Sequence, residues 1–342
     1  MANIEDIGID LGSSNVLIYA KDRGIVLNEP AMLAVDHDAG NVIAIGTDAR
    51  KMLGREPNHI EVVRPLQSAV IRDFDMLSIM LNHFVGLVIG RRLFSRPRAV
   101  LSISCVANEL EKRQLVLGML EAGTRRTTLL PRPMAAAIGY GINIAPHVGH
   151  MVIDIGGANA HAAAIASGEI MSESTDITGG DAFTEAIIRY IRVKYNLLIG
   201  FDTAEDIKCS MGSLTDLGDS EVSFPLAGRS LVSGLPKQIA VKAAEIKEAM
   251  EEPKQSFINS LITFIERLPA QLANDVFDNG ITVTGGGANL KGLRRIMEES
   301  LNARCIIADH PQETVAVGCG YVLESPQNYS MILNERRKTG NA

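Results

Sequence analysis

Tryptophan is absent from the 342 residues of this chain, and aromatic residues make up only 4% of it. Proteins that hold single-stranded nucleic acid stack its bases on such side chains, so the sequence offers few platforms of this kind. Acidic residues outnumber basic ones by 40 to 33, and the net charge of -7 argues against the basic surface that sequence-independent nucleic-acid binding needs. We therefore expect no nucleic-acid partner.

Cysteine is also scarce. The four cysteines are scattered along the chain without a close pair, at Cys105, Cys209, Cys305 and Cys319. A zinc site needs clustered ligands, and a secreted disulfide scaffold has many more cysteines per residue. The pattern predicts reduced thiols in a cytoplasmic protein.

Long apolar runs are missing as well. The longest, residues 76–90, is broken by three polar residues and falls short of the roughly 20 residues that a spanning helix requires. Polar and acidic residues within the first six positions also interrupt the apolar region that a signal peptide would need. We expect a soluble protein that is attached at most to a membrane surface.

One short pattern is present twice. Residues 10–15 read Asp-Leu-Gly-Ser-Ser-Asn and residues 154–159 read Asp-Ile-Gly-Gly-Ala-Asn, and each follows one apolar run and precedes another. A tight turn of small residues lets backbone N–H groups approach an anion. The Asp at the strand end supplies a carboxylate that can hold Mg²⁺, usually through water. Two such turns facing each other would bind a polyphosphate from both sides.

The rest of the chain alternates strands with helices, which predicts an α/β fold. Helices are expected at residues 74–88, 108–122, 203–211, 237–252, 257–268 and 290–301, and a strand at 281–284 runs into the glycine-rich turn 285–289. A chain of this length predicts two domains. We place one lobe at 1–150 with a smaller subdomain near 30–75, a second at 151–325 with a smaller subdomain near 185–255, and a polar tail at 326–342.

The two turns and the late glycine-rich turn resemble those of the actin-like ATPase superfamily, and within it the bacterial actins of the MreB family. The resemblance extends from Ile7 to about Leu323. Its most specific stretches are residues 24–30, 133–139, 195–200, 203–208 and 284–288. It implies an actin-like fold of two related, subdivided lobes with a nucleotide in the cleft between them.

The resemblance also implies a function. Such a protein binds ATP and Mg²⁺, polymerises with other copies of itself, and lies in the cytoplasm at the inner face of the membrane. There it organises cell-wall synthesis together with other shape proteins. A small-molecule kinase of the same superfamily is the alternative, but no stretch resembles its catalytic carboxylate or substrate pocket. A chaperone ATPase would need an additional substrate-binding domain, and we expect 342 residues to leave no room for one.

Site residues follow from the same resemblance. Asp10 and Asp154 match positions near Mg²⁺. Phosphate contacts are implied for Gly12, Ser13, Ser14, Asn15, Val16, Gly156, Gly157 and Ala158, and contacts to ribose, base or adenosine for Glu205, Asp206, Ile207, Lys208, Gly285, Gly286, Gly287 and Ala288. From the sequence alone, an exposed ion pair explains Glu205 and Lys208 equally well. For His161, directly after the second turn, we favour a role other than nucleotide contact.

Two residues depart from the family pattern. Arg132 stands where the family normally has a glutamate that positions the attacking water, and Asn159 stands where it normally has a threonine. A guanidinium has five donors and no acceptor, so it cannot orient water as a carboxylate does. We predict ATP binding with slow hydrolysis. The alternatives are that Arg132 points to solvent while a nearby carboxylate takes over, or that its charge stabilises the transition state.

Leu93 and Phe94 form an apolar pair among the cations Arg91, Arg92, Arg96 and Arg98. An apolar pair in a loop usually belongs to the core. Apolar tips ringed by cations also suit insertion into an anionic membrane surface, and the same loop contacts the membrane in the resembled family. We favour the membrane contact.

Overall fold

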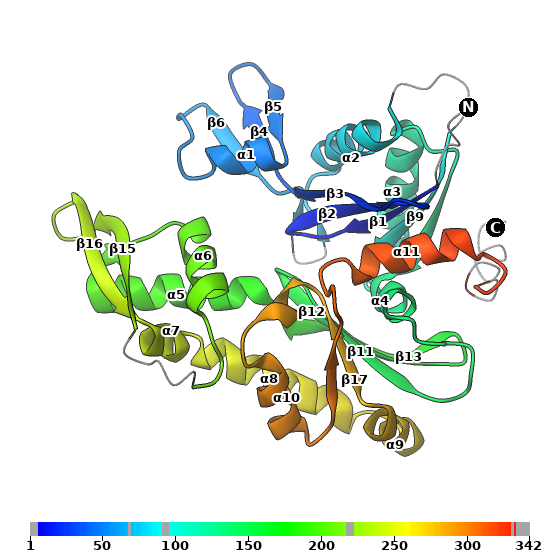
Figure 1. Cartoon of the computed structure of the whole chain (residues 1–342). Coiled ribbons are helices and arrows are strands. Elements are labelled where there is room, and N and C mark those ends of the chain that lie inside the picture. Colours follow the sequence, from blue (N-terminus) through cyan, green and yellow to red (C-terminus); the bar gives the residue numbers. More distant parts are fainter. Residues whose placement is uncertain (1–5, 68–69, 91–95, 217–221, 330–331, 333–342) are drawn as a thin grey trace.

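The computed structural model describes residues 6–67, 70–90, 96–216, 222–329 and 332, and two five-stranded sheets dominate it (Figure 1). The first has the order β10-β9-β1-β2-β3 and the second the order β13-β12-β11-β17-β18. In each sheet the first three strands along the chain are antiparallel, and two later strands add in parallel. The two halves of the chain therefore repeat one topology.

The strands of the first sheet are β1 (Ile7–Leu11), β2 (Asn15–Ala20), β3 (Gly24–Pro30), β9 (Arg98–Ile103) and β10 (Arg126–Pro131). Those of the second are β11 (His150–Ile155), β12 (Asn159–Ala166), β13 (Glu169–Thr178), β17 (Ile281–Thr284) and β18 (Cys305–Ile307). The turns between β1 and β2 and between β11 and β12 hold the two predicted copies of the pattern. Both copies were expected between strands, and this prediction is confirmed.

Smaller elements extend from each large sheet (Figure 1). One group consists of β4 (Leu33–Asp36), β5 (Asn41–Ile45), β6 (Ile60–Val63) and α1 (Thr47–Met52). The other consists of β14 (Leu197–Leu198), β15 (Ser223–Ser230), β16 (Pro236–Lys242), α6 (Phe201–Met211) and α7 (Ala243–Ala249). A short hairpin of β7 (Leu66–Gln67) and β8 (Val70–Ile71) follows the first group.

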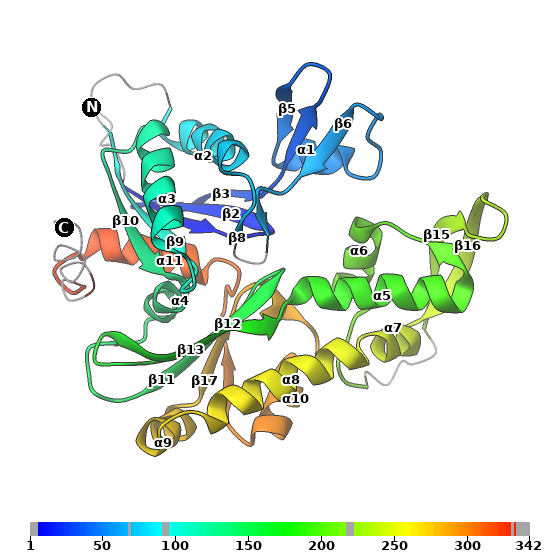
Figure 2. The ribbon, with the colours of Figure 1, turned by 180° about the vertical axis from the view of Figure 1, so that it is seen from behind.

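Two helices cover the outer face of the first sheet, α2 (Phe74–Ile89) and α3 (Glu109–Glu121) (Figure 2). Asp73 caps α2 by accepting a hydrogen bond from the N–H of Met76 at 3.0 Å. The buried stripe of α2 includes Leu77, Leu81 and Phe84, at the helical spacing that the sequence predicted. Asn108 and Glu111 form a capping box at the start of α3.

The two halves are joined through α4 (Arg132–Tyr140) and α11 (Thr314–Glu324). Although α11 comes near the end of the chain, it packs on β1 and β9 of the first sheet and on α4. A side chain at Gly139 would collide with the backbone of Thr314, so glycine allows the two helices to touch. At the far end of α11, the hydroxyl of Tyr19 donates to Glu324 at 2.7 Å.

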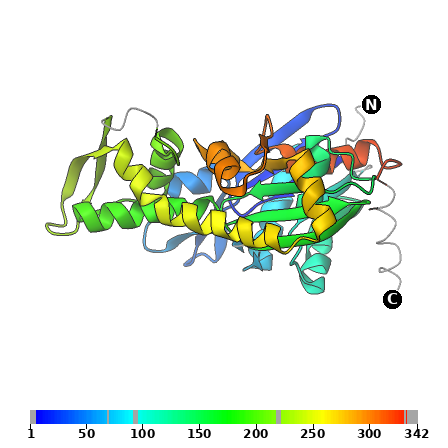
Figure 3. The ribbon, with the colours of Figure 1, turned by 90° about the horizontal axis from the view of Figure 1, so that it is seen from below.

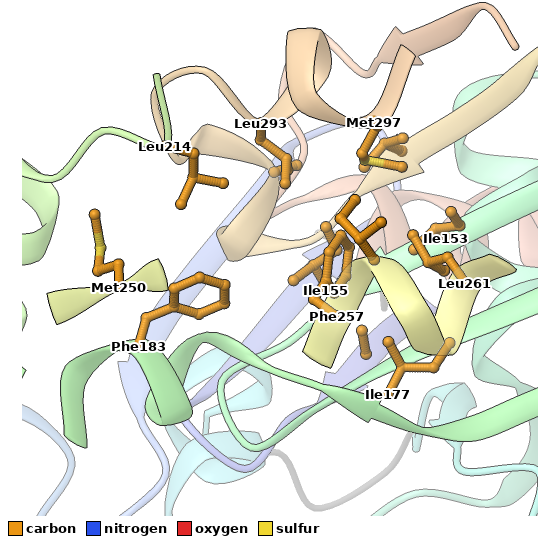
Figure 4. Packing of buried hydrophobic residues seen from close by; sticks show 14 of the residues in the cluster. Ile153, Ile155, Ile177, Phe183, Leu214, Met250, Phe257, Leu261, Leu293 and Met297 are labelled. Atoms are coloured by element: carbon orange, nitrogen blue, oxygen red, sulfur yellow. The ribbon is translucent and has the colours of Figure 1, made fainter. Parts of the chain in front are cut away.

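The second half has the larger core. It lies between the second sheet and the helices α5 (Gly180–Tyr195), α8 (Glu251–Glu266), α9 (Ala270–Asn279) and α10 (Leu293–Leu301). Figure 3 shows α8 crossing below the second sheet, and Figure 4 shows Phe183 of α5 and Phe257 of α8 among its buried side chains. Full burial of one such side chain contributes roughly 1.5 to 3 kcal/mol. None of the helices in the described part of the chain combines the length and apolar composition needed to cross a membrane.

One helix prediction is wrong. Residues 237–242 of the helix expected at 237–252 belong to strand β16 (Pro236–Lys242), which pairs antiparallel with β15. The helical residues of that range lie in α7 and at the start of α8. The partly buried Ile239 and the buried Val241 alternate with exposed neighbours, as a strand requires. The helices expected at 237–252 and 257–268 are not separated at Pro253, because this residue lies in the first turn of α8, where its missing N–H breaks no helical hydrogen bond.

Candidate functional site

The two small-residue turns meet at their tips. In each turn the second residue after the Asp donates its N–H to the carbonyl three positions on, Gly12 to Asn15 at 3.0 Å and Gly156 to Asn159 at 3.1 Å. A side chain at Gly157 would collide with the hydroxyl of Ser14. The turns therefore face each other at contact distance, and glycine at 157 makes this approach possible.

The first turn of α5 anchors the second of these turns. The N–H of Gly180 donates to the Gly156 carbonyl at 2.9 Å, and the N–H of Asp181 donates to the Gly157 carbonyl at 2.7 Å. The initial N–H groups of a helix have no partner within it, so these contacts satisfy two of them. The position of the turn is thus coupled to the long helix that leads to β14.

A cleft of about 350 Å³ lies beside the two turns. Of the predicted residues it is lined by Asp10, Gly12, Ser13, Ser14, Asn15, Gly156, Gly157, Glu205, Lys208, Gly285, Gly286 and Gly287. Within the described residues, Asp154, Val16, Ala158, Asp206, Ile207 and Ala288 do not line it. Val16 and Ala288 are buried, and Ile207 packs on the core of the second half.

The glycine-rich turn closes one side of the cleft. Gly285 has a φ of 84°, and the 3₁₀ turn Gly286–Asn289 follows it. A side chain at Gly285 would meet Asp154 and the backbone of Ile155, and one at Gly287 would meet the Ile155 side chain. Glycine is needed here both for the left-handed backbone and for close packing on the end of β11. The helix expected from 290 begins at Leu293 instead.

Glu205 and Lys208 form an ion pair that is largely buried. The Lys208 Nζ lies 2.7 Å from Glu205 Oε2, and the two side chains are 11% and 28% exposed, respectively. Lys208 Nζ also donates to the Gly180 carbonyl and to Thr184 Oγ1, each at 3.0 Å. Burial alone would raise the pKa of Glu205. The ammonium of Lys208 has the opposite effect, and the net result is a lowered pKa. The alternative of an exposed ion pair is therefore wrong, because this pair forms one wall of the cleft.

Arg132 lies between the two aspartates of the repeated pattern. Its Nη1 donates to Asp10 Oδ1 at 2.6 Å, its Nη2 donates to Asp10 Oδ2 at 3.0 Å, and its Nε donates to Asp154. The side chains of Arg132, Asp10 and Asp154 are 13%, 4% and 0% exposed. The alternative that Arg132 points to solvent is thus wrong. Burial disfavours its charge, but Asp10 and then Asp154 outweigh this and raise the pKa of the guanidinium.

The topology explains this meeting. Asp10 is the next-to-last residue of β1, and Arg132 follows β10 directly. The carboxyl ends of parallel strands meet at one edge of a sheet, so β1, β9 and β10 bring their last residues together. Ser102, near the end of β9, joins them by donating to Asp10 Oδ1 at 2.9 Å and accepting from the Leu11 N–H at 3.2 Å. Ser102 could not be identified from the sequence, because nothing in its local context marks it.

His161, for which we favour a role other than nucleotide contact, also lines the cleft. It pairs with Asp154 in the register of β11 and β12 and is 5% exposed. Burial, reinforced by the charge of Arg132, lowers its pKa to about 4, so the imidazole is neutral at pH 7. Its Nδ1 has no hydrogen-bond partner within the described residues. Nearby, the Asn159 amide donates to the Thr175 carbonyl at 3.0 Å, which fixes that side chain.

The donor set does not suit the predicted Mg²⁺. Three of the four carboxylate oxygens of Asp10 and Asp154 already accept from Arg132. No group of three or more His, Cys, Asp or Glu side chains that could hold a metal is found among the described residues.

Ion pairs also cross the cleft near its mouth. Arg64, between β6 and β7, lies 3.8 Å from Asp181 of α5, and its guanidinium lies 5.4 Å from the ring centroid of Phe201. Burial raises the pKa of Asp181, and Arg64 opposes this. Arg50 of α1 lies 3.6 Å from Asp202 of α6 in a more exposed pair. These contacts connect the smaller elements of the two halves.

The predicted membrane pair, Leu93 and Phe94, lies outside the described residues. Of the four arginines around it, Arg98 begins β9, and its Nε donates to Asp6 at 2.8 Å. Hydrogen bonding to Asp6 raises the pKa of Arg98. Arg98 is therefore tied to Asp6, the residue before β1, while its side chain stays 39% exposed.

Known proteins resemble this chain over nearly its whole length. Residues 4–331 match the family model described as MreB/Mbl protein. The chain is 40% identical over 321 residues to the cell shape-determining protein Mbl of Bacillus subtilis (strain 168), covering 94% of this chain and 96% of that protein. It is 39% identical over 324 residues to the cell shape-determining protein MreB of Escherichia coli (strain K12), covering 93% of each.

Solved structures agree with these similarities. MreB5 of Spiroplasma citri bound to ADP matches with a TM-score of 0.89 at 32% identity, covering 96% of this chain and 98% of that one. The MamK double helical filament matches with a TM-score of 0.78 at 19% identity and shows the same fold. The actin-like fold predicted from the sequence is thereby confirmed, and the chain belongs to the MreB/Mbl family.

Proposed function

We propose that this protein is an ATP-binding bacterial actin homologue that polymerises into membrane-associated filaments and organises cell-wall synthesis to maintain cell shape. The observation that carries the proposal is the pair of facing turns with matched backbone hydrogen bonds, beside the glycine-rich turn. Its relatives are named as cell shape-determining proteins, and MreB5 of Spiroplasma citri has been crystallised with ADP and with AMPPNP.

In this proposal the phosphates lie between the two turns. Small residues leave the backbone N–H groups of both turns accessible to phosphate oxygens, and Ser13 and Ser14 add hydroxyl donors. The nucleoside lies towards Glu205, Lys208 and the glycine-rich turn, which line the same cleft. A polar pair at a cleft wall can fix the orientation of a ribose or base by hydrogen bonds.

Polymerisation, membrane attachment and wall synthesis rest on the family. MamK, with the same fold, is seen as a double helical filament. Leu93 and Phe94 are the residues that we assign to the membrane, so the protein is cytoplasmic and peripheral, with other copies of itself and wall-synthesis proteins as partners. We also retain the lobes at 1–150 and 151–325 as a proposal. The small-molecule kinase is not favoured, because relatives that match the whole chain are cell shape-determining proteins.

Sedimentation tests this function. The chain is incubated without nucleotide, with ATP, and with ATP plus liposomes that contain phosphatidylglycerol, and the pellet is assayed after centrifugation. We expect ATP-dependent pelleting and co-sedimentation with the liposomes. Electron microscopy of the same samples separates filaments from amorphous aggregates. A chain that stays in the supernatant with ATP at every concentration, or that phosphorylates a small molecule, would refute the proposal.

A further inference from the structure

Two buried carboxylates at the base of the cleft share one cation. Asp10 and Asp154 come from different sheets, and both are almost fully buried. A buried charge is tolerated only when it is paired and hydrogen-bonded. Arg132 supplies that pairing with three hydrogen bonds, and Ser102 adds a fourth to Asp10. A side chain of the protein itself, Arg132, thus provides a positive charge between the two carboxylates.

The same arrangement leaves little for a metal ion to coordinate. Mg²⁺ prefers an octahedral shell of oxygens and is usually held by one or two carboxylates in addition to water and phosphate. Asp10 and Asp154 together have four carboxylate oxygens. Of these, Oδ1 of Asp154 is buried and has no hydrogen-bond partner among the described residues. One free oxygen is too little for direct coordination, because Mg²⁺ takes an octahedral shell of oxygens.

Arg132 can also contact a ligand. A guanidinium has five N–H donors in a plane, and the two aspartates use three of them. Arg132 lines the cleft beside both turns, which is where the proposed function places the phosphates. Planar donors of this kind suit phosphate oxygens well.

We infer that Arg132 takes the place of a divalent cation at Asp10 and Asp154, so that the cleft binds a nucleoside polyphosphate without metal coordination by these aspartates. The inference rests on the proposed function, since it concerns how the same cleft receives ATP. Arg132 balances one of the two negative charges, donates hydrogen bonds to both aspartates, and donates to the terminal phosphates with its remaining N–H groups. ATP binding is then independent of Mg²⁺.

Equilibrium dialysis with radiolabelled ATP tests this, with either MgCl₂ or EDTA in the buffer. We expect the dissociation constants of the unaltered chain to agree within about threefold, whereas a site that needed the metal would lose about tenfold or more in EDTA. Such a loss would overturn the inference while leaving the proposed function intact. An absence of ATP binding in both buffers would overturn the ATP assignment together with the inference.

Two variants sharpen the result. Arg132→Gln removes the charge, and we expect ATP binding in EDTA to weaken by about 100-fold and to recover with Mg²⁺. Arg126→Gln makes the same change at an exposed position at the other end of β10, and we expect no effect. MgCl₂ alone should raise the melting temperature of Arg132→Gln but not that of the unaltered chain. Equal responses of the two chains to Mg²⁺ would contradict the inference.

Discussion

Arg132 donates through Nε to Asp154, which is completely buried near the end of β11. Arg132 begins α4 next to the first sheet, whereas Asp154 belongs to the second, so this ion pair joins the two halves at the base of the cleft. The same guanidinium holds Asp10 with two further hydrogen bonds. The cleft beside the two turns is thereby linked to the relative position of the two sheets.

Loss of Arg132 should destabilise the protein. Arg132→Ala leaves two buried carboxylates without a cation, which typically costs about 3 to 5 kcal/mol of the free energy of unfolding. Urea unfolding at neutral pH measures this, with Arg126→Ala as the exposed control. A loss below about 1 kcal/mol, as is usual for a surface pair, would contradict the structural role.

The destabilisation should also depend on pH. Burial is the largest effect that raises the pKa of Asp10, and Arg132 opposes it, so in the variant that pKa lies higher still. An acid whose pKa is higher in the folded state than in the unfolded state destabilises the folded state once the pH is high enough to ionise it. At lower pH the group is protonated, and this destabilisation disappears. We expect the difference between variant and unaltered chain to be smaller at about pH 5 than at about pH 7.5.

ATP hydrolysis should be slow. The side chain of Arg132 only donates hydrogen bonds, and three of its five N–H groups already donate to the two aspartates, so it cannot accept a hydrogen bond from an attacking water. Arg132→Glu combined with Asn159→Thr should raise phosphate release several-fold in the presence of Mg²⁺. A malachite-green assay compares both chains side by side with a relative that has the glutamate. A rate for the unaltered chain equal to that of the relative would refute the prediction.

The contact between the two turns should be sensitive to one methyl group. Gly157→Ala places a methyl group against the Ser14 hydroxyl, which must shift, and we expect ATP binding to weaken by about tenfold. Ser14→Gly alone gives the loss due to its hydroxyl, and adding Gly157→Ala to that variant should cause no further loss, because the obstacle is gone. Isothermal titration measures each variant. If the single variant binds ATP as well as the unaltered chain does, the phosphates do not lie between the turns.

The ion pair across the mouth of the cleft should slow ligand release. Arg64→Ala removes both the pair with Asp181 and the contact with Phe201, so the dissociation rate of a fluorescent ATP analogue should rise several-fold. Stopped-flow displacement measures the rate. Arg23→Ala, on the turn between β2 and β3, serves as a control away from the cleft. An unchanged rate in Arg64→Ala would mean that these contacts do not close the cleft.

Membrane attachment should depend on Leu93 and Phe94. Burial of these two side chains contributes about 3 to 5 kcal/mol per subunit, and a filament multiplies the contact. Changing both to Ser should abolish co-sedimentation with liposomes while ATP-dependent pelleting persists. Circular dichroism checks that the variant folds. An unfolded variant would assign the pair to the core instead.

Much of the fold could be predicted because the signals are local. The spacing of Leu77, Leu81 and Phe84 specifies the buried face of α2, and Asp followed by small residues marks both turns at the ends of β1 and β11. The strand 281–284 and its glycine-rich turn are likewise determined by neighbouring residues. Such patterns depend on backbone conformation and burial within a few residues, so the sequence carries them directly.

Contacts between distant residues were decided by the tertiary structure. Residues 236–242 have no local feature that separates helix from strand, and pairing with β15 makes them a strand. Arg132 is 122 residues from Asp10 and 22 from Asp154 along the chain, so its unusual identity could be noticed in the sequence but its partners could not. The charges of Arg132, Asp10 and Asp154 come together only when the two sheets fold against α4. A guanidinium buried at that position must pair with the carboxylates that the topology places beside it.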